Sequence, residues 1–560
     1  MKKSYSKIIL EDYRNDFSYK KSESNLNIQF NRTAFIFFIF FVIYLIYTIH
    51  LIHLGSRKSK IDKIPTLKNK LYRADIVDKN GNYLAKAVSS IDIGIKSRDV
   101  IDKQKLLLNL KIIFPNKNFD EIKKKLNEKN FFWLEKKISG ENYEKIMRLG
   151  DKSIRPQEKV LRIYPQKNLF SHIIGQIDDS NNGISGLEKS FDKILRNSKN
   201  PIKLTVDKDI QFLVRNELVN FQKIFRNKGS AAILMNVNSG DIISIVSLPD
   251  FNPNQRKNIT DVNFINRVTK GTYELGSVFK PFTFAGALND SLIEPDTEFL
   301  DLPKSISCGG FPIREYDKDM PSNLTAEEIL IRSGNIGSVR IAQKIGPENF
   351  KSFLEKIGVL SQINFDIEEV AYQENFEFGK CKLATASFGH GVTTTILQLA
   401  KGYAILSNGG FDVTPKLVES DKKNDNKKIR LLKKGVSEKV VRALRKIVNT
   451  EEGTAKLANV KNYQIAGKTG TAQQPIKGKY SRTKINTFAS IFPSSKPEYV
   501  FIVMLDSPKT SSSYIYSYRH KKGTQTGTPY NTAGWTSVEV AGKIIDKIGP
   551  ILATKYIEIN

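Results

Sequence analysis

The feature that most constrains this chain is an uncharged apolar run near its start, AFIFFIFFVIYLIYTIHLIHL, from Ala34 to Leu54. As a helix this run would rise about 31 Å at about 1.5 Å per residue, which matches the hydrocarbon core of a bilayer. A cleaved signal peptide has a shorter apolar region and a small-residue cleavage site, and neither fits here. We therefore expect an uncleaved, single membrane-spanning helix.

Basic residues lie on both sides of this run. They include Lys2, Lys3, Lys7, Lys20, Lys21 and Arg32 before it, and Arg57, Lys58 and Lys60 after it. Positive charge is retained on the cytoplasmic side of a membrane, so the leader is expected to lie in the cytoplasm. Because the second flank is basic too, charge alone does not fix the orientation.

The composition narrows the classes of function that remain. A length of 560 residues predicts two or three domains, and a net charge of +30 is a property shared with nucleic-acid-binding proteins. The lysines are spread along the whole chain without a basic face of interleaved aromatics, so we expect no nucleic-acid binding. Cys308 and Cys381 allow one disulfide, whose formation stays open, and the five histidines show no metal-ligand spacing, so we expect no metal site.

The first part of the chain after the anchor contains short elements in a lysine-rich region. An Asn-Gly pair within Leu71–Ala85 predicts a β-hairpin. Apolar residues from Phe119 onward fall at helical spacing, which predicts an amphipathic surface helix over Asp120–Ile138. The Gly-, Asn- and Asp-rich segment Leu161–Leu195 is typical of a connection between domains.

The remainder of the chain contains longer, better patterned elements. Two apolar runs predict an antiparallel hairpin over Ala231–Pro249, and further strands are expected at Thr487–Ser494 and Glu498–Ser507, after a long helical middle. Strands, then helices, then strands predict an α/β (α+β) domain whose central antiparallel sheet is closed by segments distant in sequence. The polar stretches Asp421–Lys434 and Ser511–Thr528 are predicted to be exposed loops.

Two short motifs in this part contain hydroxyl and amine or amide groups at close spacing. Ser277 and Lys280, in YELGSVFKPFT, would share one face of a helix, so that a hydroxyl lies beside an amine able to act as its base. Ser-x-x-Lys also arises by chance, and alone it is more often a solvated helix end. Further along, a capped helix runs into Ser333-Gly334-Asn335, where glycine allows a tight turn that would direct a hydroxyl and an amide toward the same cleft.

The third motif is Lys468-Thr469-Gly470-Thr471, in IAGKTGTAQQ. A phosphate-binding loop would need glycine where Asn462 stands, so that class of site is excluded. If the segment is instead a strand beside the helix of the first motif, it offers charge and hydroxyl groups, and its glycine lets a substrate backbone approach.

In this order, Ser-x-x-Lys, Ser-x-Asn and Lys-Thr-Gly form the motif set of serine β-lactamases and penicillin-binding proteins. From the anchor almost to its C-terminus the chain resembles a class B penicillin-binding protein, in segments such as RSGNIGSVRIAQKIG, SFGHGVTTTILQLAKGYAILSNGG, EEGTAKLANVKNYQIAGKTGTA and GISGLEKSFDKIL. Asn335, the single anchor and the length most resemble the division-specific septal D,D-transpeptidases. Two positions depart from the family pattern: Leu275 stands in place of the usual proline, and Thr532–Ile545 lacks the usual Ala-Pro.

The resemblance implies a domain order. Residues 1–33 would be a cytoplasmic segment, 34–54 the transmembrane anchor, 55–200 a non-catalytic pedestal of the dimerisation type, and 201–560 the penicillin-binding transpeptidase domain. The last is similar in fold to serine β-lactamases, with helices flanking a central antiparallel sheet.

The resemblance also implies acyl transfer on the D-Ala-D-Ala end of a peptidoglycan stem peptide, without metal or cofactor. Ser277 would be the nucleophile and Lys280 its base, although the identity of the base is disputed across the family. Ser333 would relay the proton to the departing amine. Asn335 would orient the substrate amide.

The third motif would complete this catalytic arrangement. Lys468 would add positive charge near the relay serine, and Thr469 and Thr471 would hold the substrate carboxylate beside Gly470. The backbone N–H groups of Ser277 and Thr471 would form the oxyanion hole.

As partners the resemblance implies stem-peptide donors and amine acceptors, β-lactams, the septal glycan polymerase and small bitopic division proteins. The catalytic domain would be periplasmic, anchored in the bacterial cytoplasmic membrane by one helix. Three alternatives stay open: an elongation-specific transpeptidase, a hydrolytic relative such as a D,D-carboxypeptidase or anchored β-lactamase, and a catalytically weak division scaffold.

Overall fold

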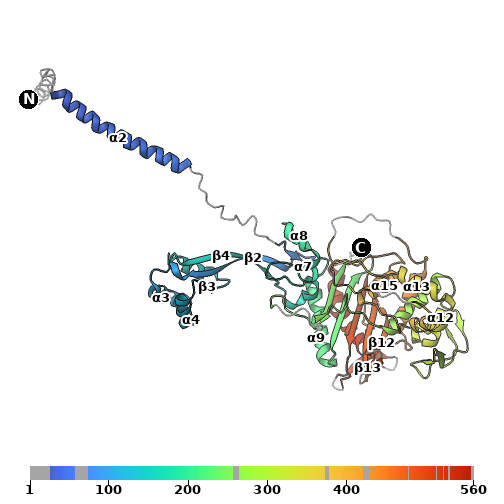
Figure 1. The fold of residues 1–560 in the computed structure, drawn as a ribbon. Helices are drawn as coiled ribbons and strands as arrows, with labels where there is room; N and C mark the ends of the chain where they lie inside the picture. Colours follow the sequence, from blue (N-terminus) through green and yellow to red (C-terminus); the bar gives the residue numbers. More distant parts are fainter. Residues whose placement is uncertain are drawn as a thin grey trace, which may run out of the picture. The chain divides into compact units, whose positions relative to one another are not determined.

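The structure, a computed structural model, describes residues 25–56, 73–255, 264–372, 377–419, 429–476, 479–511, 514–520, 523–527 and 530–555. The chain forms two compact units, residues 1–71 and 72–560. In the first unit the apolar run forms α2 (Asn25–Ser56). Its segment Arg32–His53, within the helix labelled α2 in Figure 1, is, among the described residues, the one helical stretch long and apolar enough to cross a membrane, and its large apolar side chains are exposed. The run is therefore a helix whose exposed apolar surface suits a bilayer rather than water.

The N-terminal part of the second unit is a small mixed layer of sheet and helices. Its sheet has the order β3-β2-β1-β5, with β4 also paired to β2. These strands are β1 (Ile76–Val77), β2 (Tyr83–Lys96), β3 (Phe131–Glu135), β4 (Ile154–Ile163) and β5 (Ile202–Lys203), and the helices are α3 (Lys103–Ile113), α4 (Phe119–Glu128) and α5 (Gly140–Met147). Side chains from the far ends of β2, β3 and β4 and from the three helices form a separate core.

The predicted Asn-Gly hairpin is confirmed, whereas the helix predicted over Asp120–Ile138 is wrong in its second half. The β1–β2 turn is held by the Asp78 carboxylate, which accepts hydrogen bonds from the N–H groups of Asn80 and Asn82 at 2.9 and 2.7 Å. The helix α4 ends at Glu128, and β3 follows with side chains that alternate between exposed and buried positions against β2. Consecutive aromatic residues in β3 favour a half-buried strand over another helical turn.

The segment predicted to be a connection, Leu161–Leu195, is packed rather than loose. It contains the end of β4, the short helices α6 (Ser171–Ile174) and α7 (Gly186–Ser190), and the first part of α8 (Asp192–Asn197). Its buried apolar side chains, among them Phe170 and Leu187, belong to the larger core of the unit.

A five-stranded antiparallel sheet, β12-β13-β14-β6-β7, organises the rest of the unit (Figure 1). Its strands are β6 (Gly229–Asn236), β7 (Ile242–Leu248), β12 (Ala466–Ile476), β13 (Lys479–Phe492) and β14 (Tyr499–Asp506). The hairpin and both late strands predicted from sequence are confirmed, and β14 pairs with β6 across more than 260 residues, with Tyr499 opposite Asn236. All but the last residue of β6 and β14 is buried. Both faces of the sheet are therefore covered.

The helices that pack on this sheet come from both ends of the domain and from its middle. They are α9 (Lys208–Phe225) and α17 (Ser537–Lys555), which pack on each other, together with α15 (Ile396–Ser407) and α16 (Val436–Asn449). Beside β12 lies a helical region with α10 (Lys280–Asn289), α11 (Ala326–Arg332), α12 (Asn335–Ile345), α13 (Pro347–Lys356) and α14 (Lys380–Ala386).

One of the two segments predicted to be loops forms strands instead. Within Ser511–Thr528 the chain forms an antiparallel hairpin of β15 (Tyr516–His520) and β16 (Gly523–Gly527), so the loop prediction is wrong there. Tyr516 is fully buried against Tyr514 and Trp535, and this aromatic packing stabilises strand structure in a polar sequence. Most of Asp421–Lys434 lies outside the described residues.

Candidate active site

The nucleophile candidate Ser277 lies in a tight turn at the start of a buried helix. The 3-10 turn Gly276–Phe279 leads directly into α10, whose first residue is Lys280. Gly276 has a φ of 63°, a left-handed conformation that glycine adopts without steric cost. Ser277 is half-buried and faces the cavity, while Lys280 is 2% exposed. The helical spacing predicted from the sequence is therefore present.

The second motif occupies the turn between α11 and α12, as predicted. The capping box of Thr325 and Glu328 begins α11, and α12 begins at Asn335. Ser333 ends α11 with φ 62° and ψ 40°, a left-handed conformation that is unusual for a residue with a side chain. Such strain is retained where the surrounding contacts hold it.

Lys280 is the residue that joins the first two motifs. Its amine donates to the backbone carbonyl of Ser333, to the Ser333 hydroxyl at 3.1 Å and to the Asn335 amide oxygen at 2.8 Å. These three bonds match the three donors of a lysine ammonium. A neutral amine keeps only two donors and gains a lone pair, which is what accepting a proton from Ser277 requires.

Lys468, the first residue of the third motif, contacts the Ser333 hydroxyl too. Its amine donates to the Ser333 hydroxyl at 2.9 Å and to the Thr469 carbonyl at 3.1 Å, and the side chain is fully buried. Since the Ser333 oxygen accepts hydrogen bonds from both lysines, its own proton is directed elsewhere. Burial lowers the pKa of Lys280 to about 7, against the opposing charge of Glu315. Burial and the neighbouring Lys280 hold the pKa of Lys468 well below its ordinary value.

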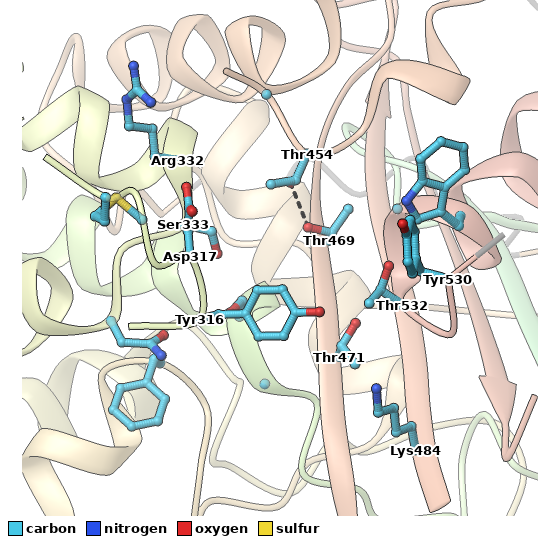
Figure 2. A pocket seen from close by; sticks show the side chains of 18 of the residues that line it. Tyr316, Asp317, Arg332, Ser333, Thr454, Thr469, Thr471, Lys484, Tyr530 and Thr532 are labelled. Atoms are coloured by element: carbon cyan, nitrogen blue, oxygen red, sulfur yellow. Dashed lines mark hydrogen bonds between the residues drawn. The ribbon is translucent and has the colours of Figure 1, made fainter. Parts of the chain in front are cut away.

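The strand β12, which carries the third motif, is at the edge of the five-stranded sheet and lies against the nucleophile turn. A Cβ on Gly470 would lie 2.3 Å from the carbonyl oxygen of Leu275, so only glycine permits this close approach. The Thr469 hydroxyl pairs with Thr454 at 2.7 Å, and the Thr471 hydroxyl accepts the Ala533 N–H at 2.9 Å (Figure 2). An accepting Thr471 oxygen leaves its proton free to donate to a ligand.

A cavity of about 820 Å³ lies over these motifs. Ser277, Ser333, Asn335, Thr469 and Thr471 line it, whereas Lys280, Lys468 and Gly470 lie behind its wall. The structure thus brings all eight predicted site residues to one place, five at the surface of the cavity and three in support. No group of three His, Cys, Asp or Glu side chains with the spacing of a metal site occurs in the described residues.

Several residues of the cavity wall were not predicted from the sequence. They are Tyr316, Arg332, His390, Thr454, Lys484, Tyr530, Thr532 and Trp535. Figure 2 shows Tyr316 extending across the cavity toward the strand of Thr471, with Lys484, Tyr530 and Thr532 on the strand side. These residues are scattered over 220 positions and belong to no short motif, so only the packed chain identifies them.

A disulfide lies close in sequence to Tyr316, which is on the part of the cavity wall that follows β10. It joins Cys308 of β9 (Ser305–Cys308) to Cys381 of α14, 73 positions later. The strand β9 pairs with β10 (Phe311–Arg314), and the chain enters the cavity wall directly after β10. The pairing that the sequence left open is therefore formed.

Two family profiles match this chain. "Penicillin binding protein transpeptidase domain" matches residues 230–524, and "Penicillin-binding Protein dimerisation domain" matches residues 68–223. A probable peptidoglycan D,D-transpeptidase FtsI from Caulobacter vibrioides is 26% identical over 498 residues, covering 86% of this chain and 82% of that protein. A probable peptidoglycan D,D-transpeptidase PenA from Neisseria gonorrhoeae is 26% identical over 458 residues, which is 76% of each chain.

A solved structure shares the fold. Penicillin-binding protein 3 of Mycobacterium tuberculosis, solved with aztreonam, superposes with a TM-score of 0.64 at 22% identity, covering 85% of this chain and 96% of that one. The transpeptidase profile alone spans more than half of the 560 residues. This chain therefore belongs to the class B penicillin-binding proteins, with a dimerisation domain followed by a transpeptidase domain.

Proposed function

We propose that Ser277 carries the acyl-enzyme of a peptidoglycan D,D-transpeptidase. The protein crosslinks stem peptides in septal cell-wall synthesis. Relatives whose names are peptidoglycan D,D-transpeptidase FtsI and PenA support this proposal. One observation carries the proposal: Lys280 and Lys468 both donate to the Ser333 hydroxyl oxygen, on the wall of the cavity that Ser277 also lines. That arrangement supplies a nucleophile, a base and a proton relay within one site.

The first half-reaction forms an ester and releases D-alanine. The Ser277 oxygen attacks the penultimate D-alanine carbonyl while the neutral amine of Lys280 takes the hydroxyl proton. The amide bond breaks as Ser333 passes its proton to the departing amine, and Ser333 is reprotonated from the two lysines that donate to it. Two amines on one hydroxyl oxygen support this relay.

The strand side of the cavity holds the substrate in this proposal. The Thr471 hydroxyl, whose oxygen accepts the Ala533 N–H, donates its proton to the terminal carboxylate. The Thr469 hydroxyl, which pairs with Thr454, and the Lys468 amine assist on the same side. The N–H groups of Ser277 and Thr471 form the oxyanion hole, an effect of about 3 kcal/mol per donor. Asn335 orients the substrate amide from the opposite side.

The second half-reaction restores the enzyme. An amine of a second stem peptide attacks the Ser277 ester, and its proton passes to the amine and hydroxyl network. The bond between the acyl carbon and the Ser277 oxygen breaks, that oxygen takes back a proton from the network, and the new amide is the crosslink. A β-lactam, whose ring amide stands in for the D-Ala-D-Ala bond, acylates Ser277 but keeps its leaving amine attached, which hinders release.

The test is covalent labelling of the full-length protein in detergent with a fluorescent penicillin, followed by peptide mass mapping. We expect an adduct on Ser277 that is absent from Ser277→Ala and present in Ser305→Ala, a matched substitution of an exposed serine on β9. Absence of an adduct on folded protein would overturn the proposal and favour the scaffold alternative.

A second assay decides the acceptor. A donor ending in D-Ala-D-Ala is supplied with and without an amine acceptor. A crosslinked product that depends on the acceptor supports transpeptidation, release of D-alanine to water alone indicates a carboxypeptidase, and rapid loss of the penicillin adduct indicates a β-lactamase.

We also propose the topology and the partners. Residues 1–33 lie in the cytoplasm and 34–54 cross the inner membrane, while the pedestal (55–200) and the catalytic domain (201–560) are periplasmic, where the substrate is. A C-terminal alkaline phosphatase fusion should be active only if the catalytic domain is periplasmic.

The pedestal would bind the septal glycan polymerase and bitopic division proteins. Depletion in the source bacterium should give filaments for a septal enzyme and rounded cells for an elongation enzyme.

A further inference from the structure

Arg314, the last residue of β10, and Glu315, which follows it, hold Asn335 from two sides. The Glu315 carboxylate accepts the backbone N–H of Asn335 through one oxygen and that of Ile336 through the other, both at 2.7 Å. The preceding carbonyl, of Arg314, accepts the side-chain amide of Asn335 at 2.8 Å. Glu315 belongs to no motif that the sequence suggested.

These bonds replace a missing helix cap. The first N–H groups of a helix lack partners within it, and a side chain of the capping residue usually satisfies one of them. The capping residue of α12 is Gly334, which has no side chain to offer. The Glu315 carboxylate caps α12 in its place, from 20 positions before Asn335 in the sequence. Its negative charge lies at the N-terminal end of α12, which is the positive end of the helix dipole.

The same contacts fix which way the Asn335 amide faces. Its nitrogen donates to the Arg314 carbonyl, so its oxygen is left to accept from Lys280 at 2.8 Å. A reversed amide would place N–H groups against the Lys280 amine and an oxygen against a carbonyl. The disulfide from Cys308 attaches the β9–β10 hairpin, and with it this segment, to α14.

Glu315 also balances the charge of the buried amines. The Lys280 and Lys468 amines meet at the Ser333 hydroxyl, and each disfavours the charged form of the other, while His390 on the cavity wall interacts with Lys280 as well. Against Lys280, the charge of Glu315 raises the pKa that burial lowers. Without that charge, the neutral form of Lys280 would extend to lower pH.

We propose that Glu315 is a positioning residue of the active site, which sets the orientation of Asn335 and supplies the negative charge that acts on the Lys280 amine. The inference rests on the proposed function for its kinetic readout. In this proposal the Glu315 carboxylate fixes the geometry of the second motif. It also sets the pH range over which Lys280 works as a base.

The experiment compares Glu315→Gln, Glu315→Asp and Glu328→Gln with the wild-type full-length protein. Glu328 is the matched control, because its carboxylate accepts the Thr325 N–H at 2.8 Å in the capping box of α11. The rate constant for acylation by a fluorescent penicillin is measured from pH 5 to 9. We expect E315Q to lower the plateau about tenfold, since one capping bond is lost, and to move the midpoint to lower pH.

E315D keeps the charge on a shorter side chain, so its midpoint should stay at the wild-type pH while its plateau falls. E328Q should keep both the midpoint and the plateau. An E315Q midpoint equal to that of the wild type would overturn the charge role, and an E315Q plateau equal to that of E328Q would overturn the positioning role.

A second readout does not depend on activity. Loss of the charge facing Lys280 should lower the melting temperature of E315Q, relative to the wild type, more at pH 6, where the amine is protonated, than at pH 9. An equal loss at both pH values would overturn the charge role. If the wild type itself is not acylated, the proposed function fails, and this measurement still decides the role of Glu315.

Discussion

Burial of Lys280 predicts how acylation of Ser277 depends on pH. The Lys280 side chain is 2% exposed, and burial lowers its pKa to about 7. Only the neutral amine can accept the Ser277 proton. At that pKa about a tenth of the molecules hold it neutral at pH 6, half at pH 7 and nine-tenths at pH 8. A lysine with the ordinary value of 10.5 would be neutral in about 3 molecules in 10,000 at pH 7.

We therefore expect the acylation rate constant to rise about tenfold between pH 6 and pH 8, with a midpoint near 7. Stopped-flow measurement with a fluorescent penicillin, in detergent and at constant ionic strength, determines the profile. A rate that is constant between pH 6 and pH 8, or that rises only above pH 9, would refute the assignment of Lys280 as the base.

The same shift has a consequence for stability. Between about pH 7 and 10.5 the unfolded chain binds the Lys280 proton and the folded chain does not, so stability rises with pH across this window. At about 1.4 kcal/mol per pH unit, the full effect is about 5 kcal/mol. Lys280→Met should therefore be more stable than the wild type at pH 6 although it is not acylated, while Lys356→Met, at an exposed lysine, should change neither. A less stable K280M at pH 6 would contradict the reasoning.

Three further variants test other parts of the site. Thr471→Val removes the proton expected to bind the substrate carboxylate and should lower kcat/KM for a D-Ala-D-Ala donor by about tenfold or more, with the fold unchanged by circular dichroism. Gly470→Ala places a Cβ 2.3 Å from the Leu275 carbonyl, so penicillin labelling and melting temperature should both fall. Cys308→Ser with Cys381→Ser opens a link across 73 positions and should lower the free energy of unfolding by up to about 4 kcal/mol, whereas an unchanged denaturation midpoint would exclude this.

Features that depend on neighbouring residues were predictable from the sequence. The anchor follows from one uncharged run, the first hairpin follows from the turn chemistry of Asn-Gly, and the hairpin within Ala231–Pro249 follows from two apolar runs. The order of the three motifs was enough to indicate the site residues, because each motif is short and lies at the start of a helix, in a turn or on a strand. The sequence-based prediction was wrong for the aromatic stretch that forms β3 and for the polar stretch that forms β15 and β16. Both stretches are strands because they pack against segments that are distant in the sequence.

Only the tertiary structure decided how the motifs meet. Ser333 receives hydrogen bonds from Lys280, 53 positions away, and from Lys468, 135 positions away. The disulfide, the capping carboxylate of Glu315 and the lowered pKa of Lys280 likewise arise from packing that no local pattern encodes. The sequence by itself determined which chemical groups are present and in what order. Their distances, burial and protonation were decided by the fold, because each depends on segments that folding brings together from remote parts of the chain.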